Sequence, residues 1–267
     1  GVARSWWGTR LDSSTADEPW PIVAGTAHVR HGDFALNPEQ TPLAKLWVGA
    51  WMGDRFQVAP APPLEEKSAE REWVEQTMYL HNDDRAAQRR ARLAMWSFHA
   101  LLLFGIGLLA WRLLGLPWAA GMLAFLALEP TVGAHLPVVM TDLPAALTLL
   151  LAALSLAWLL VRRSWPAAAW LGVALGLAWS SKHSALGGLG GLALFGAAAA
   201  AGIAWKQGRR QGVRVFGQLA LAGLLAFVVL WAQYGFRYRA RAHGSDPFNR
   251  GIVAEIVGLR LPHWRTA

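Results

Sequence analysis

The sequence contains no cysteine and comparatively little charge. Only 16% of its 267 residues are Asp, Glu, Lys or Arg, whereas 54% are apolar; an ordinary soluble domain is about one quarter charged. The absence of cysteine excludes a disulfide scaffold, a thiolate metal site and a cysteine nucleophile, but it leaves the cellular compartment open. The low charge excludes a disordered chain, a cytosolic enzyme and a nucleic-acid-binding module as descriptions of the whole chain.

Four long runs without any charged residue indicate the class of protein. They cover residues 93–111, 143–161, 184–205 and 215–236, and each is long enough to cross a bilayer as a helix. Two weaker apolar runs lie between them, at residues 117–137, which include Glu129, and at residues 165–181. We therefore predict an all-α, polytopic membrane helix bundle with six spans over residues 93–236.

Positive charge is concentrated in the membrane part of the chain. Residues 1–92 contain 11 basic and 13 acidic residues, a net charge of −2. Because the whole chain has a net charge of +8, residues 93–267 carry +10. Six of these cations fill two short loops: Arg162, Arg163, Lys206, Arg209, Arg210 and Arg214. Basic loops of this kind are typical of the cytoplasmic side, so we expect residues 1–92 outside and no nucleic-acid partner. The expected location is the bacterial inner (plasma) membrane.

Residues 1–92 differ in composition from the rest and predict a folded extracytoplasmic loop with turn-rich segments. Residues 64–80 have apolar and acidic residues at helical spacing. They predict an amphipathic helix that lies either on the membrane surface or against the rest of the loop. The chain has no initiator Met and no signal-like segment. We therefore expect a preceding span, and expect residues 237–267 to begin a further extracytoplasmic segment.

Several polar residues fall at the predicted outer ends of the spans. They are Asp17 and Glu18 in the loop, His135 and Asp142 between the second and third spans, and Lys182 and His183 after the fourth. Polar groups at such positions are costly and often functional. Taken singly, each has an ordinary explanation, such as a solvated loop acid, a helix cap or an interfacial lysine. Because all of these residues fall on the same predicted side of the membrane, they favour one common site.

The order of these motifs resembles a known family. The relevant segments are Asp17-Glu18-Pro19-Trp20, Asn37-Pro38-Glu39-Gln40-Thr41-Pro42-Leu43-Ala44-Lys45, Thr141-Asp142-Leu143 and Ser181-Lys182-His183-Ser184. Together they are similar to motifs of polyprenyl-phosphate-dependent membrane glycosyltransferases, which include protein O-mannosyltransferases and the aminoarabinose transferases of lipid A. The resemblance extends in order over nearly the whole chain.

The resemblance implies an all-helical C-type glycosyltransferase fold and a set of site residues. It makes Asp17 the expected catalytic base, with Glu18 beside it. It places Pro42, Leu43 and Lys45 in a loop that shapes the substrate site, and Asp142 and Lys182 at the membrane-facing wall of that site. Glu39, His135 and His183 are further candidates for substrate binding.

The chemistry of sugar transfer fits these residue types. A carboxylate such as Asp17 takes the proton of the acceptor hydroxyl, and a cation stabilises the departing lipid phosphate. Lys182 is the first candidate for that cation, and the further candidates are His183, Arg237, Arg239 and Arg241. The expected function is therefore transfer of a sugar from a polyprenyl-phosphate donor to a lipid, glycan or protein acceptor at the extracytoplasmic face.

The sequence also allows other interpretations of these residues. His28, His31 and Asp33 have spacing that suits a divalent metal ion, although the sequence places no fourth ligand. The alternative from another class is a transporter or other non-enzymatic polytopic membrane protein, with Glu129, Asp142 and Lys182 along a substrate path. Glycines 172, 176, 187, 188, 190 and 191 lie in apolar runs, where we expect close helix packing rather than phosphate binding.

Overall fold

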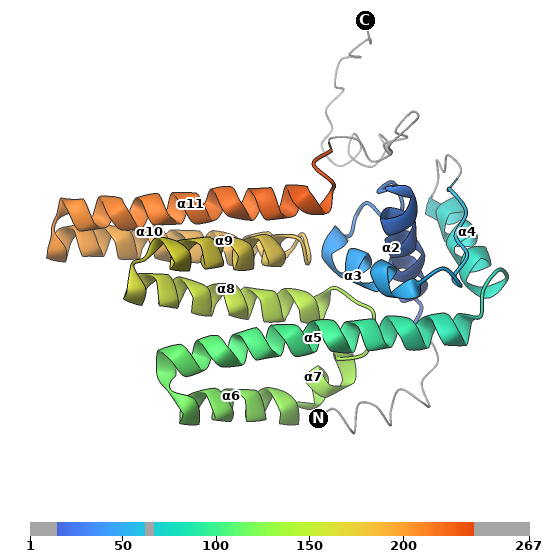
Figure 1. Cartoon of the computed structure of the whole chain (residues 1–267), viewed down its shortest axis with the longest axis horizontal. Helices are drawn as coiled ribbons and strands as arrows, with labels where there is room; N and C mark the ends of the chain where they lie inside the picture. Colours follow the sequence, from blue (N-terminus) through green and yellow to red (C-terminus); the bar gives the residue numbers. More distant parts are fainter. Residues whose placement is uncertain (1–14, 62–66, 238–267) are drawn as a thin grey trace, which may run out of the picture.

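The computed structural model describes residues 15–61 and 67–237, and this part of the chain is helical without any strand. The helices are α2 (Pro19–His31), α3 (Pro42–Met52), α4 (Lys67–Tyr79), α5 (Asp84–Leu114), α6 (Leu116–Leu128), α7 (Pro130–His135), α8 (Asp142–Arg162), α9 (Trp165–Trp179), α10 (Ala185–Gln207) and α11 (Arg209–Gln233). Long helices lie side by side, and α2, α3 and α4 gather at one end of them (Figure 1). We call this the α2–α4 end. The predicted all-α class is confirmed for the described residues. The predicted segment 237–267 lies almost wholly outside them.

Four helices, α5, α8, α10 and α11, are long and apolar enough to cross a membrane. The two weaker runs form only α6, of 13 residues, and α9, of 15 residues. At 1.5 Å per residue these helices are about 20 and 23 Å long, short of the roughly 30 Å of a hydrocarbon core. The run at residues 117–137 is interrupted because Pro130 starts a new helix and the Glu129 carboxylate accepts the Val132 N–H at 2.6 Å. The structure thus supports four of the six predicted spans by length and composition.

The first span does not begin at residue 93. Helix α5 starts nine residues earlier, where the Asp83 carboxylate caps it by accepting the Ala86 N–H at 2.9 Å. Its polar first turns pack beside α3, whereas its later turns pack against α6 and α8. The predicted boundary between residues 92 and 93 therefore falls inside one continuous helix, which links the loop to the bundle.

Helix α4 corresponds to the predicted amphipathic segment, with residues 62–66 outside the described part. It buries Glu70, Val74, Thr77 and Met78 and packs against α2. The helix thus packs on the rest of the loop, and its contact with the membrane surface stays a prediction.

Two glycines allow α2 and α3 to cross in contact. A Cβ atom added to Gly25 would lie 2.1 Å from the carbonyl oxygen of Lys45, and one added to Gly49 would lie 2.1 Å from the carbonyl oxygen of Gly25. Both obstacles are backbone atoms, which cannot rotate away. The crossing therefore requires glycine at both positions.

We expect Gly49→Ala to lower the free energy of unfolding by about 1–3 kcal/mol, because the added methyl group must push the two helices apart. Gly133→Ala is the matched control, since a Cβ atom at Gly133 meets nothing within 4 Å. Denaturant unfolding in detergent, followed by tryptophan fluorescence, measures both variants. Equal stability of the two would contradict the close crossing.

The glycines that were predicted to pack closely fall into two groups, according to whether an added Cβ atom would meet a neighbouring helix. Added Cβ atoms at Gly172 and Gly176 would lie 2.6 Å from Leu225 and Val229 side chains, so the predicted close packing is confirmed between α9 and α11. At Gly187, Gly190 and Gly191 an added Cβ atom meets nothing within 4 Å. The packing prediction is wrong for these three, because this face of α10 has no neighbouring helix in the described part of the chain.

Candidate functional site

The start of α2 is held by a buried ion pair. Glu18 is completely buried, and its Oε2 lies 3.0 Å from Nη2 of Arg92 on α5, which is 5% exposed. Arg92 Nε also donates to Glu18 Oε1 at 3.1 Å, and the Val139 N–H donates to the same oxygen at 3.3 Å. One carboxylate thus joins α2, α5 and the segment between α7 and α8. Because Glu18 is completely buried, it anchors the start of α2 and does not face solvent.

Asp17, the other member of the acidic pair, has the opposite environment. It is exposed, and its carboxylate has no hydrogen bond or ion pair within the described ranges. Its backbone is fixed through Glu18, and it precedes the N-terminus of α2, whose helix dipole favours a negative charge. The pair therefore divides into one anchoring acid and one accessible acid.

Asp142 and Lys182, which were both predicted at the outer ends of the spans, form an ion pair. Asp142 begins α8, Lys182 follows the end of α9, and the two side chains are 61% and 37% exposed. Asp142 lies three residues after Val139, the residue that contacts Glu18. Asp17 and this ion pair are thus tied to the two ends of one short segment.

The start of α3 reaches the same corner of the molecule. Pro42 is buried at the first position of α3, and the N–H of the next residue, Leu43, donates to the carbonyl oxygen of Ser180 at 3.1 Å. Ser181 and Thr148 hydroxyls lie 3.1 Å apart, which fixes the end of α9 on α8. The predicted role of Pro42 in shaping this corner agrees with its position.

The two histidines of the predicted wall do not contact Asp17. His135 is half-buried on α7, where its Nδ1 lies 2.7 Å from the Thr131 carbonyl oxygen. His183 is exposed in the turn beside Lys182. Only His183 is thus adjacent to the ion pair.

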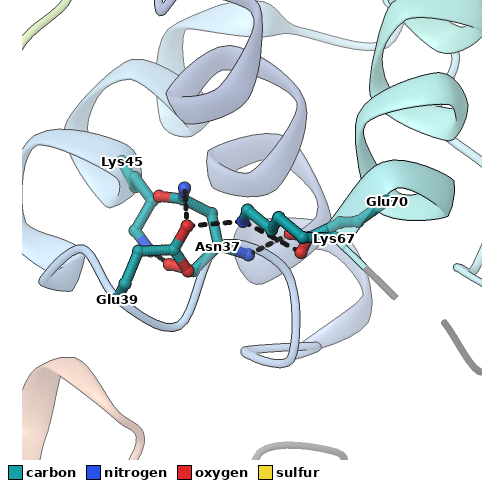
Figure 2. A network of polar contacts seen from close by, with 5 residues as sticks. All are labelled: Asn37, Glu39, Lys45, Lys67 and Glu70. Atoms are coloured by element: carbon teal, nitrogen blue, oxygen red, sulfur yellow. Dashed lines mark hydrogen bonds and ion pairs between the residues drawn. The ribbon is translucent and has the colours of Figure 1, made fainter. Parts of the chain in front are cut away.

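Lys45 and Glu39 belong to a separate network, shown in Figure 2. The Lys45 ammonium is buried and donates to the carbonyl oxygen of Asn37 at 2.8 Å. Glu39 accepts from the Asn37 side-chain amide at 3.2 Å and pairs with Lys67. Glu70 on α4 accepts the Asn37 N–H at 2.6 Å. The network holds Asn37 in a left-handed conformation, with φ of 51°, and so fixes the segment that leads into α3.

Burial lowers the pKa of Lys45 from 10.5 to about 7, mainly because the charged form loses its hydration; the neighbouring Glu39 and Glu70 charges oppose this shift. The unfolded chain therefore binds more protons than the folded chain between pH 7 and pH 10.5. Stability should rise with pH over this window, because raising the pH removes the cost of a buried ammonium.

We expect this contribution to the free energy of unfolding to grow by about 2 kcal/mol between pH 7 and pH 9. Lys45→Met lacks the titrating group and should lose that part of the rise. Denaturant titrations of both chains at several pH values provide the comparison. Parallel pH profiles of the two chains would show that Lys45 keeps an ordinary pKa in the folded protein.

The predicted metal ligands are not brought together. His28 is buried with its ring 4.6 Å from that of Phe34, and burial, followed by the nearby Lys45 charge, lowers its pKa. His31 Nε2 lies 2.9 Å from the Val58 carbonyl oxygen, and Asp33 accepts the Ala35 N–H. Residues 15–61 and 67–237 contain no cluster of three side chains that could hold a metal ion.

One further predicted cation, Arg237, lies beyond α11, with its guanidinium 5.3 Å from the ring centre of Phe34. Arg239 and Arg241 lie outside the described residues. The sequence analysis missed Arg92 as the partner of Glu18, because the two residues lie 74 positions apart in the chain.

No family model, curated protein or solved structure matches this chain. The candidate site consists of the accessible Asp17 carboxylate, next to the anchored Glu18, and the accessible Asp142–Lys182 ion pair, which begins three residues after the Val139 contact of Glu18.

Proposed function

We propose that this chain transfers a sugar from a polyprenyl-phosphate carrier to a hydroxyl group of an acceptor, at the extracytoplasmic face of the membrane. The observation that carries the proposal is the pairing of environments at residues 17 and 18. Glu18 is buried against Arg92 and accepts the N–H of Val139, three residues before Asp142, while its neighbour Asp17 is exposed. Asp17 is the base and Lys182 the cation in this proposal.

The charge distribution supports the choice of face. Arg112, Arg162 and Arg163 lie at the ends of α5 and α8, and Lys206 and Arg209 flank the turn between α10 and α11. These turns lie at the end of the helices opposite to the α2–α4 end (Figure 1). Basic turns are retained in the cytoplasm, so the α2–α4 end faces outward in this proposal.

In the proposed reaction the acceptor oxygen bonds to the anomeric carbon while the bond from that carbon to the phosphate oxygen breaks. Asp17 takes the hydroxyl proton, and the bonding electrons remain on the phosphate. Lys182 stabilises the phosphate charge, and Asp142 holds the lysine in place before the donor binds. Arg92 holds Glu18 in place, and Glu18 in turn fixes the position of its neighbour Asp17. Lys45 fixes the segment that contains Asn37 and Glu39.

The direct test uses a panel of polyprenyl phosphates that carry different labelled sugars. Each is incubated with membranes that contain either the unaltered chain or the Asp17→Asn chain at matched expression. We expect label to leave one donor and to enter an acceptor only with the unaltered chain. Retention of the label by every donor, with the folded chain present, would contradict the proposed function.

We expect Lys182→Ala to raise the donor concentration needed for half-maximal transfer by roughly tenfold, because the phosphate loses its cationic partner. Lys182→Arg should retain part of the effect, since it supplies a cation of different geometry. Lys206→Ala, which removes an exposed cation at the opposite end, is the control. Unchanged donor dependence in Lys182→Ala would leave Lys182 as an interfacial anchor.

A further inference from the structure

Five arginines lie at the end of the bundle opposite to the α2–α4 end (Figure 1). They belong to the turn that joins α8 to α9, to the turn that joins α10 to α11, and to the first turns of α11: Arg162, Arg163, Arg209, Arg210 and Arg214. We call them the arginine cluster. Arg163 is half-buried, and the other four are exposed.

Side-chain contacts fasten the two turns to each other. Nη1 of Arg163 donates to Oε1 of Gln207, the last residue of α10. Gln218 of α11 is completely buried, and its Nε2 donates to the carbonyl oxygen of Arg163 at 2.8 Å. Arg163 has a left-handed backbone with φ of 50°, which this bond helps to hold. The two turns, and the arginines in them, therefore lie side by side.

No carboxylate pairs with the arginine cluster in the part of the chain that the structure describes. The sequence has no Asp or Glu between Asp142 and Asp246. Asp142 begins α8 and Arg162 ends it, so about 30 Å of helix separates these two residues. The Debye length at physiological ionic strength is only about 8 Å. The positive charge of the cluster is thus uncompensated and attracts an anion from outside the chain.

The surroundings of the cluster favour a lipid over a soluble partner. Trp205, in the last turn of α10, is 90% exposed, and Trp165, the first residue of α9, is 49% exposed. Indole rings concentrate at the level of the lipid headgroups. The connections are also short, because only Gly208 separates α10 from α11 and only two residues separate α8 from α9. The arginines are therefore kept close to the ends of apolar helices, at headgroup depth.

We propose that the arginine cluster binds the phosphate groups of anionic phospholipids, with phosphatidylglycerol as the type, in the leaflet at this end of the helices. The planar guanidinium group offers N–H donors in a fork that matches two phosphate oxygens. In the orientation inferred from the basic turns this is the cytoplasmic leaflet, whose anionic lipids attract basic segments. The site does not depend on the proposed sugar transfer, because it lies at the opposite end of the helices.

The test compares two lipids of different charge. The full chain is placed in nanodiscs with equal amounts of phosphatidylglycerol and phosphatidylcholine, and native mass spectrometry counts the molecules of each that stay bound after release into detergent. We expect phosphatidylglycerol to predominate. Arg209→Gln combined with Arg210→Gln should lower the preference on the order of tenfold, because each cation near the headgroups strengthens binding several-fold. Both side chains are exposed, so the change leaves the packing of α10 and α11 intact.

Arg85→Gln combined with Arg89→Gln is the matched control. It removes two exposed arginines from the first turns of α5, at the α2–α4 end, and should keep the preference of the unaltered chain. Arg162→Gln combined with Arg214→Gln removes two other members of the cluster and replaces the first pair if that chain does not fold.

Equal losses in the control and in the cluster variants would overturn the proposal, since the effect would then follow net charge alone. An unchanged preference for phosphatidylglycerol in both cluster variants would also overturn it. Without any such preference, an oligonucleotide that binds the chain in pure phosphatidylcholine nanodiscs and is released by the Arg209→Gln, Arg210→Gln change would assign the cluster to a soluble polyanion instead.

Discussion

Glu18→Gln is expected to lower the free energy of unfolding by about 3–5 kcal/mol, because it removes the carboxylate charge that pairs with the buried Arg92. Arg92 is 5% exposed, and two of its nitrogens donate to the Glu18 carboxylate, at 3.1 and 3.0 Å. The amide has the same shape, but it carries no charge and only one acceptor oxygen. Denaturant unfolding in detergent, with matched protein and detergent concentrations, gives the difference.

Two comparison chains show whether the loss comes from the ion pair. Asp17→Asn makes the same chemical change at the exposed neighbour and should alter stability by no more than about 0.5 kcal/mol. Glu18→Gln combined with Arg92→Met removes both charges and should recover part of the loss. Stability of Glu18→Gln equal to that of Asp17→Asn would contradict a buried ion pair at this position.

The fold class could be predicted from the sequence because membrane helices need long runs without charge, and such runs are visible directly. The lengths of the weaker helices could not. Residues 117–137 are apolar enough to suggest a span, but Glu129 and Pro130 together end one helix and start another. Ser180 lies at the C-cap of α9, where its hydroxyl bonds to the carbonyl oxygen of Gly176. These endings depend on local hydrogen bonds, which hydropathy does not report.

The candidate site was predictable only in part for a similar reason. Asp142 and Lys182 were expected on one side because each ends an apolar run, and the structure pairs them. Glu18 and Asp17 are adjacent acids, and nothing in their local sequence indicates that one is buried and the other exposed. Their difference arises from Arg92, which lies 74 residues beyond Glu18 in the chain. Only the contact of Glu18 with Arg92 in the folded chain reveals it.

Asp17→Asn is expected to lower turnover on the order of a hundredfold or more while donor binding persists. A base accepts the proton of the acceptor hydroxyl as the new bond forms, and an amide of the same shape cannot accept it. The effect should therefore appear in kcat rather than in the donor concentration for half-maximal rate. Transfer rates with the donor found in the panel, at saturating acceptor and matched expression, provide the measurement.

The control for this change is Asp54→Asn, another exposed acid of the same loop, which should retain near-normal turnover. Glu18→Gln must be compared at a temperature where it is still folded, because a loss of activity through unfolding would imitate a catalytic effect. In the folded state it should reduce turnover less than Asp17→Asn, since Glu18 acts through the position of its neighbour. Near-normal turnover in Asp17→Asn would remove the base from this position. If Glu18→Gln lost turnover at the same time while still folded, the proton acceptor would have to be Glu18, and the buried ion pair with Arg92 would have to open during the reaction.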